Sequence, residues 1–118
     1  MKNYKNKIKL LDTTNFENFK KIQYIMQCND TKQKQNNILI EIIYSHCNYE
    51  IIISGLNITP IDNGQLFEFP TSEILKITML YTTYKYSKKR MDEAKNFLML
   101  NLETLIDAYL ISNKNLYI

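Results

Sequence analysis

The residues best able to do chemistry in this 118-residue sequence are Cys28, His46 and Cys47. A thiol nucleophile needs an imidazole that faces it, but neighbouring side chains such as those of His46 and Cys47 point apart in a helix and in a strand. A structural zinc site takes about four ligands, and the chain has only these Cys and His residues. We therefore expect reduced thiols, no metal, no cofactor and no thiol enzyme.

The other reactive side chains also favour binding over catalysis. The twelve acidic residues show no spacing that singles out a catalytic pair, and two glycines cannot supply a phosphate-binding loop. Nine Tyr and five Phe could stack on bases, yet most fall at spacings typical of a core. Arg90 is the only arginine, whereas nucleic-acid readers usually have several. We expect a protein that is not an enzyme and does not bind nucleic acid.

Composition and charge are uneven along the chain. Ile, Asn, Lys and Leu make up 58 of the 118 residues, which is typical of an AT-rich genome. Residues 1–35 have eight bases against three acids (+5), residues 36–84 one against five (−4), and residues 85–118 six against four (+2). No apolar run suits a signal peptide or a membrane span, so we expect a cytoplasmic or nuclear protein without a membrane partner. The length fits a single domain over 1–118 with a disordered tail over 1–6.

Alternating patterns predict a small sheet in the first half. Strands are expected at Lys7–Leu11 and Phe19–Cys28, with turn chemistry at Asp12–Asn15 between them. A rival register begins the sheet at Gln23. Ile38–Ser45 is expected to form a helix capped by the preceding Asn pair, although such an Ile-rich run also fits a strand.

Two shorter strands are expected around a central loop. Tyr49–Ser54 has a strand pattern that Gly55 ends. The loop Asn57–Gln65 follows, and it contains an Asn-Gly turn signal. Leu66–Phe69 is then a short strand that Pro70 stops.

The second half contains two helical patterns. The first helix is expected to begin after Pro70, with Thr71 or Ser72 as its cap. Its apolar face consists of Ile74, Ile77, Leu80, Tyr81 and Tyr84. A charged loop over residues 85–95 follows, and the last helix opens near Asn101. That helix has the most regular apolar stripe, which consists of Leu102, Leu105, Ile106, Tyr109 and Leu110.

This order of elements resembles the elongin C and SCF-adaptor family, which has the BTB/POZ fold. The likeness lies in the strand ending at Phe69-Pro70, in ILKITMLYTTYK at Ile74–Lys85, and in FLMLNLETLIDAYLISN at Phe97–Asn113. The positions that meet the family pattern are Pro70, Lys76, Thr82, Lys85, Phe97, Leu98, Thr104, Leu105, Leu110 and Asn113. The short connecting loop and the early chain end favour the elongin C branch. The resemblance implies an α+β fold in which a mixed sheet of about three strands packs against helices, with a helical pair at the C-terminus.

The resemblance also implies an adaptor of a cullin-RING ubiquitin ligase, in the ubiquitin conjugation pathway. One face would pair with an elongin B-like ubiquitin-fold protein. An apolar pocket would hold the BC-box helix of a substrate receptor, and the same end would meet a cullin scaffold. This is helix-in-groove recognition between proteins. The pocket positions are Leu80, Tyr81, Leu105, Ala108, Leu110, Lys114 and Tyr117.

Three positions depart from the family pattern, and two alternatives stay open. Leu80 stands where the family has Tyr or Trp, Lys114 where it has an aromatic residue, and Tyr117 where it has Cys or Ile. These changes bear on which receptor helices fit and on cullin binding. The alternatives are another BTB/POZ module that self-associates, and an unrelated small α+β binding protein such as a pathogen effector.

Overall fold

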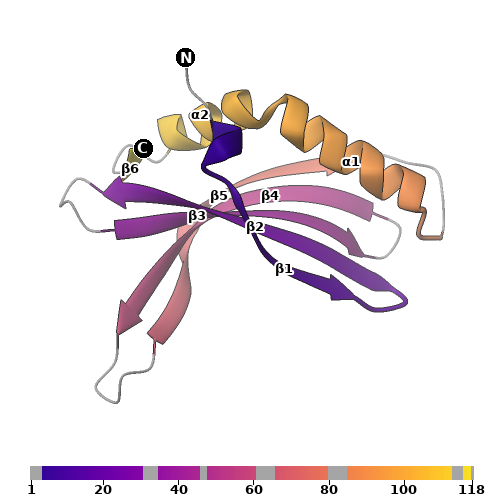
Figure 1. The fold of residues 1–118 in the computed structure, drawn as a ribbon, viewed down its shortest axis with the longest axis horizontal. Coiled ribbons are helices and arrows are strands. Elements are labelled where there is room, and N and C mark those ends of the chain that lie inside the picture. Colours follow the sequence, from indigo (N-terminus) through magenta and orange to yellow (C-terminus); the bar gives the residue numbers. More distant parts are fainter. Residues whose placement is uncertain are drawn as a thin grey trace.

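The computed structural model describes residues 4–30, 35–45, 48–60, 66–79, 85–112 and 116–117. Its elements are a 3-10 helix η1 (Tyr4–Asn6), strands β1 (Lys9–Asn15), β2 (Phe19–Asp30), β3 (Gln35–Ser45), β4 (Asn48–Pro60) and β5 (Leu66–Met79), helices α1 (Lys88–Leu100) and α2 (Leu102–Ser112), and strand β6 (Leu116–Tyr117). The fold is therefore mixed α+β, which confirms the expected class. Figure 1 shows both helices on one side of the sheet.

The sheet is an antiparallel meander in the order β1-β2-β3-β4-β5. Each strand pairs with the next one along the chain, and the two-residue β6 pairs with the far end of β2 through Asn29↔Tyr117 and Asp30↔Leu116. The sheet thus has five long strands where about three were expected. β3 comes from a segment that was predicted to be helical, and β5 extends the predicted strand Leu66–Phe69 through a second such segment. The rival register from Gln23 is wrong because the sheet begins with β1 at Lys9.

The core lies between the sheet and the two helices. In β3 every second side chain, from Ile38 to Tyr44, is buried, and in β4 the same holds from Tyr49 to Ile53. This period of two is the signature of a strand with one face against a core. The helices contribute Met91, Ala94, Leu98, Leu102, Leu105, Ile106 and Tyr109 to the same cluster.

The predicted helix over Ile38–Ser45 is wrong, because this segment is β3. Ile38, Ile40 and Ile42 are each fully buried, which a helix could not achieve for three residues spaced two apart. Branched Ile side chains also favour the pleated surface of a sheet. The Asn pair before Ile38 therefore lies within the strand and caps no helix.

The helix predicted after Pro70 is also wrong, because β5 runs from Leu66 through Pro70 to Met79. Among the strands described, β5 pairs with β4 alone and is an edge strand. Proline is tolerated at such an edge, where one side of the strand has no ladder to complete. Leu75 and Ile77 are half-buried while Lys76 and Thr78 are exposed, so the alternation is that of a strand.

Helix α1 occupies most of the segment that was expected to be a charged loop. Its buried residues Met91, Ala94 and Leu98 lie three and four positions apart and share one helical face. The charged residues between them fall on the solvent side, where Lys88 pairs with Asp92 and Arg90 with Glu93. The last helix, α2, confirms the prediction, since Leu102, Leu105, Ile106 and Tyr109 are all buried.

Three smaller expectations are also corrected. Asp12–Asn15 belongs to β1, and the chain turns at residues 16–18. Gly55 does not end β4 but lies in a bulge between Ser54 and Leu56. The loop predicted over Asn57–Gln65 starts later, because β4 continues to Pro60. Beyond Leu56, β4 pairs only with β5, and Figure 1 shows this two-stranded arm leaving the rest of the sheet.

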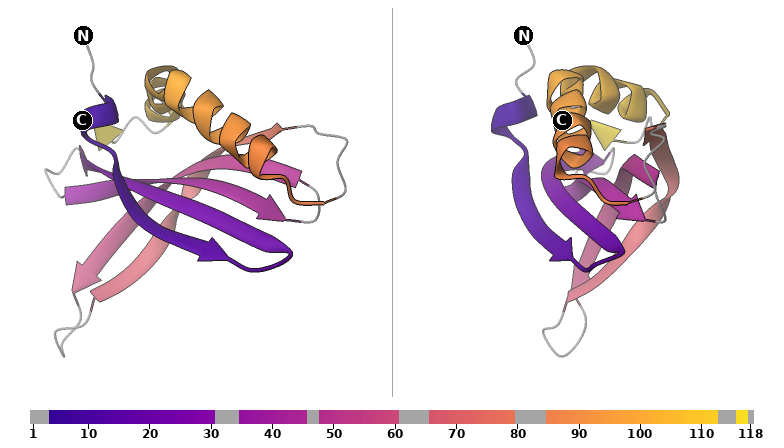
Figure 2. Two further views of the ribbon diagram at one scale, coloured as in Figure 1. Left: turned by 45° about the vertical axis from the view of Figure 1, so that its right-hand side comes forward. Right: turned by 90° about the vertical axis from the view of Figure 1, so that its right-hand side faces the viewer.

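The start of the chain is tied to its last helix. Residues Tyr4–Asn6, expected within a disordered tail, form η1, and Tyr4 is buried. The Tyr4 hydroxyl donates a hydrogen bond of 2.9 Å to Oδ1 of Asp107 in α2. The left view of Figure 2 shows η1 beside the helical layer, and η1 contacts α2.

Neighbouring isoleucines in β4 give a test of which face is the core. We expect Ile51→Ala to lower the free energy of unfolding by about 3 kcal/mol, because it leaves a cavity at a fully buried site. Ile52→Ala, on the half-buried opposite face, should cost about 1 kcal/mol. Urea denaturation of both variants measures the difference, and equal losses would contradict the assignment of the faces.

Candidate protein interface

The structure separates the described members of the predicted receptor pocket. Leu105 lies in the core at 9 % exposure, and Leu110 is half-buried and packs against the same cluster. Ala108, on the same helix, is exposed. These side chains therefore do not share one exposed surface. Leu80, Tyr81 and Lys114 lie outside the described residues, and for Tyr117 the structure describes the backbone in β6.

A different surface stands out on the side of the sheet that faces away from the helices. We call it the open face, and the strand registers assign to it Lys21, Gln23, Ile25, Leu39, Glu41, Ile43, Glu50, Ile52, Lys76 and Thr78. These residues alternate with the buried ones, so each points to the opposite side of the pleat. Both helices of the described chain pack on the other side (Figure 1).

Four aliphatic side chains lie next to Glu41 on the open face. Ile25 of β2 is directly opposite Leu39 of β3. Ile52 of β4 is opposite Glu41, which places it diagonally between Leu39 and Ile43. All four aliphatic side chains are half-buried. They form a continuous strip across the three central strands.

Charged and polar side chains border this strip, and Glu41 lies within it. The Lys76 and Glu50 side chains form an ion pair with 2.9 Å between Nζ and Oε2. Glu41 accepts a hydrogen bond of 3.0 Å from Nε2 of Gln23 and lies 4.0 Å from Nζ of Lys21. Such partly exposed pairs contribute little to folding stability, about 0–1 kcal/mol each. Their main effect is to border the aliphatic strip with both signs of charge.

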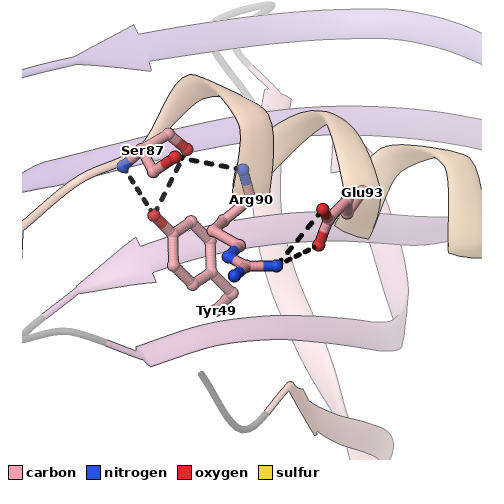
Figure 3. Close-up of polar contacts among 4 residues, drawn as sticks. All are labelled: Tyr49, Ser87, Arg90 and Glu93. Atoms are coloured by element: carbon pink, nitrogen blue, oxygen red, sulfur yellow. Dashed lines mark hydrogen bonds and ion pairs between the residues drawn. The ribbon is translucent and has the colours of Figure 1, made fainter. Parts of the chain in front are cut away.

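Helix α1, which packs on the opposite side of the sheet, is anchored at its N-cap residue (Figure 3). Ser87 caps the helix, with its Oγ accepting from the backbone N–H of Arg90 at 3.4 Å. The Tyr49 hydroxyl accepts from the Ser87 backbone N–H at 2.8 Å and donates to its carbonyl at 3.3 Å. The buried β4 side chain thus holds both the donor and the acceptor of the capping residue, which fixes where α1 begins over the sheet.

Aromatic rings extend this anchor towards β2. The rings of Tyr44 and Tyr49 have centroids 5.0 Å apart, and those of Tyr44 and Tyr86 5.3 Å. Nζ of Lys20 lies 4.6 Å from the Tyr86 centroid, within the range of a cation–π contact. Burial raises the pKa of the Tyr86 hydroxyl, with a smaller effect from Tyr49 in the same direction. The Tyr86 phenol therefore stays protonated to a higher pH than a free tyrosine would, and the Lys20 ammonium lies over its neutral ring.

The described residues offer no reactive cluster. Within the ranges given above, no group of three or more His, Cys, Asp or Glu side chains could hold a metal ion. Cys28 is a buried thiol of the core, and His46 and Cys47 lie outside the described residues. None of the described helices is long and apolar enough to cross a membrane.

Sequence reasoning missed the open face, although one signal for it was present. In Phe19–Cys28 the alternation that identified a strand also assigned Gln23 and Ile25 to its second face. The same alternation in Ile38–Ser45 and Tyr49–Ser54 would have identified Leu39, Ile43 and Ile52. The alternation identifies the open face only when these segments are recognised as neighbouring strands.

Comparisons with protein-family models, with curated proteins and with solved structures give no match to this chain.

The anchor at Tyr49 can be tested by removing one oxygen. We expect Tyr49→Phe to lower the free energy of unfolding by about 2 kcal/mol, because the half-buried Ser87 backbone groups lose their partner while the ring packing is kept. Tyr86→Phe, which removes a hydroxyl without such a role, should cost less than half of this. Chemical denaturation gives both values, and a Tyr49→Phe protein as stable as the wild type would rule out the anchor.

Proposed function

We propose that this chain is a protein-interaction module without catalytic activity, and that it binds a folded partner through its open face. The observation that supports the proposal is the strip formed by Ile25, Leu39, Ile43 and Ile52 on the side of the sheet without helices. A one-sided antiparallel sheet normally alternates apolar residues inside with polar residues outside. This outer face instead has four aliphatic side chains around Glu41.

The layout of this face matches the general anatomy of protein interfaces. Interfaces have an apolar centre depleted of charge and a polar, solvated rim. Here the aliphatic strip is the centre and includes Glu41, which Gln23 and Lys21 contact, while Lys21, Glu50 and Lys76 provide the rim. The complementary partner is a folded protein with an apolar patch bordered by both signs of charge. A nucleic acid would instead need a one-signed basic surface.

The open face can be tested by site-specific photo-crosslinking. A photoreactive amino acid at Ile52 should crosslink to one discrete protein in cells of the source organism. The same amino acid at Thr104, exposed on α2, is the matched control and should not capture that protein. We expect Ile52→Lys to reduce the partner's affinity by about 100-fold, because a charge would be buried at the centre of the contact. Equal capture from both positions would contradict the proposal.

A narrower proposal follows from the resemblance to the elongin C and SCF-adaptor family. In it the partners are an elongin B-like ubiquitin-fold protein, a BC-box receptor and a cullin, and the chain acts in the cytoplasm or nucleus. Its support is α2, a helix at the positions to which the resemblance assigns Leu105, Ala108 and Leu110. A BTB/POZ fold also needs helices at Ile38–Ser45 and after Pro70, where the chain has β3 and β5. This weighs against the narrower proposal, and the broader one is favoured.

Ala108 separates the two proposals. It is exposed on α2, so Ala108→Arg should leave the fold intact. An elongin C-like adaptor should lose its receptor by at least about tenfold in affinity with this substitution and keep its ubiquitin-fold partner. A module that binds through the open face should be indifferent to it. Mass spectrometry of the proteins that co-purify with wild type and Ala108→Arg identifies which case holds; the absence of any ubiquitin-fold protein or cullin would remove the narrower proposal.

A further inference from the structure

The outer edge of β1 is the most exposed part of the described sheet. β1 pairs with β2 alone among the strands described, so its other edge faces solvent. Six of its seven residues are exposed. Leu10 is 62 % exposed, Leu11 49 %, and Phe16, just after the strand, 67 %. An edge strand of this kind can pair with another strand through its backbone N–H and C=O groups.

The register of β1 determines how its charged residues are placed. Lys9 is opposite Ile25 and Asp12 is opposite Gln23, two positions away on β2. Both partners are on the open face, so Lys9 and Asp12 share that face. They do so although they are three residues apart, because a bulge at Leu11 adds one residue between them. Lys9 and Asp12 therefore flank the Leu10-Leu11 pair symmetrically.

We propose that two copies of this chain dimerise by antiparallel pairing of their β1 strands about a twofold axis at Leu10-Leu11. In such a pairing Lys9 of each copy lies opposite Asp12 of the other, with the leucines of both copies at the centre. Opposite charges across an antiparallel pair stabilise it, and like charges destabilise it. A closed twofold contact is also the commonest way in which identical chains assemble.

Other registers of the same two strands are less favourable. An axis at Lys9 would place the two Lys9 side chains opposite each other, and an axis at Asp12 would do the same for the two aspartates. An axis at Thr13 brings no opposite charges together. The charge pattern of β1 thus selects the Leu10-Leu11 axis. Charges at an edge usually prevent pairing with unrelated strands, and here they would permit pairing with the chain's own copy.

This dimer goes beyond the function proposed above and does not depend on it. The contact uses backbone groups at the sheet edge and leaves the strip of the open face free. Because the twofold axis runs through the sheet, the two open faces lie on the same side. A partner with two binding sites, or two partners, would then meet one continuous surface.

Charge reversal at β1 tests the proposal. Sedimentation velocity over about 1–300 micromolar should show a concentration-dependent dimer for the wild type. Lys9→Asp and Asp12→Lys should each weaken dimerisation about tenfold or more, since each places two like-charged pairs across the axis. The double variant with both substitutions should restore dimerisation, because it exchanges the charges and keeps the register. Lys95→Asp, the same charge change on the exposed side of α1, is the control and should dimerise as the wild type does.

The outcomes distinguish this pairing from its rivals. A wild-type chain that stays monomeric over the whole range overturns the proposal and leaves the edge to a strand of another protein. A dimer that survives both single reversals, or that the double variant does not restore, overturns the β1 register. Lys9 and Asp12 are exposed, so circular dichroism of the variants should match that of the wild type.

Discussion

The alternation of buried isoleucines in β3 and β4 is the constraint on which the rest of the structure depends. Ile38, Ile40 and Ile42 pair across the two strands with Gly55, Ile53 and Ile51, and the isoleucines among them are fully buried. A slip of one residue between these strands would move the whole set to the other face. The helices could then not pack, because their apolar stripes would meet Glu41 and Glu50. The same alternation determines which side of the sheet stays open.

The helical layer depends on this sheet in turn. Tyr49 belongs to the buried series of β4, and its hydroxyl binds the backbone of the residue that caps α1. The register of β4 in the sheet therefore also determines where α1 begins. The open face and the β1 edge are what remain once this layer has covered one side. Their aliphatic residues do not belong to the core cluster, although the core fixes the strands that carry them. Apolar groups gathered on a surface in this way are typical of interaction sites.

Local patterns predicted the fold only where one period clearly dominates. The stripe of Leu102, Leu105, Ile106 and Tyr109 fits a helix and no strand, and Phe19–Cys28 alternates without interruption. Ile38–Ser45 contains apolar residues on both faces, so its period is hidden, and only pairing with β2 and β4 makes it a strand. Helix α1 was missed because its buried face is small. The candidate site could not be assembled from the sequence, since it requires knowing that Ile25, Leu39 and Ile52 lie on neighbouring strands.

The hydrogen bond between Tyr4 and Asp107 joins residues 103 positions apart. Every pairing within the five-strand meander is formed between strands adjacent in the chain, and can form as those segments leave the ribosome. The Tyr4–Asp107 hydrogen bond can form only after α2 has been made, long after η1. Tyr4 is therefore synthesised long before it can form this tertiary contact. Until synthesis has passed Asp107, the part of the apolar side of the sheet that α2 covers is accessible to other chains in the cell.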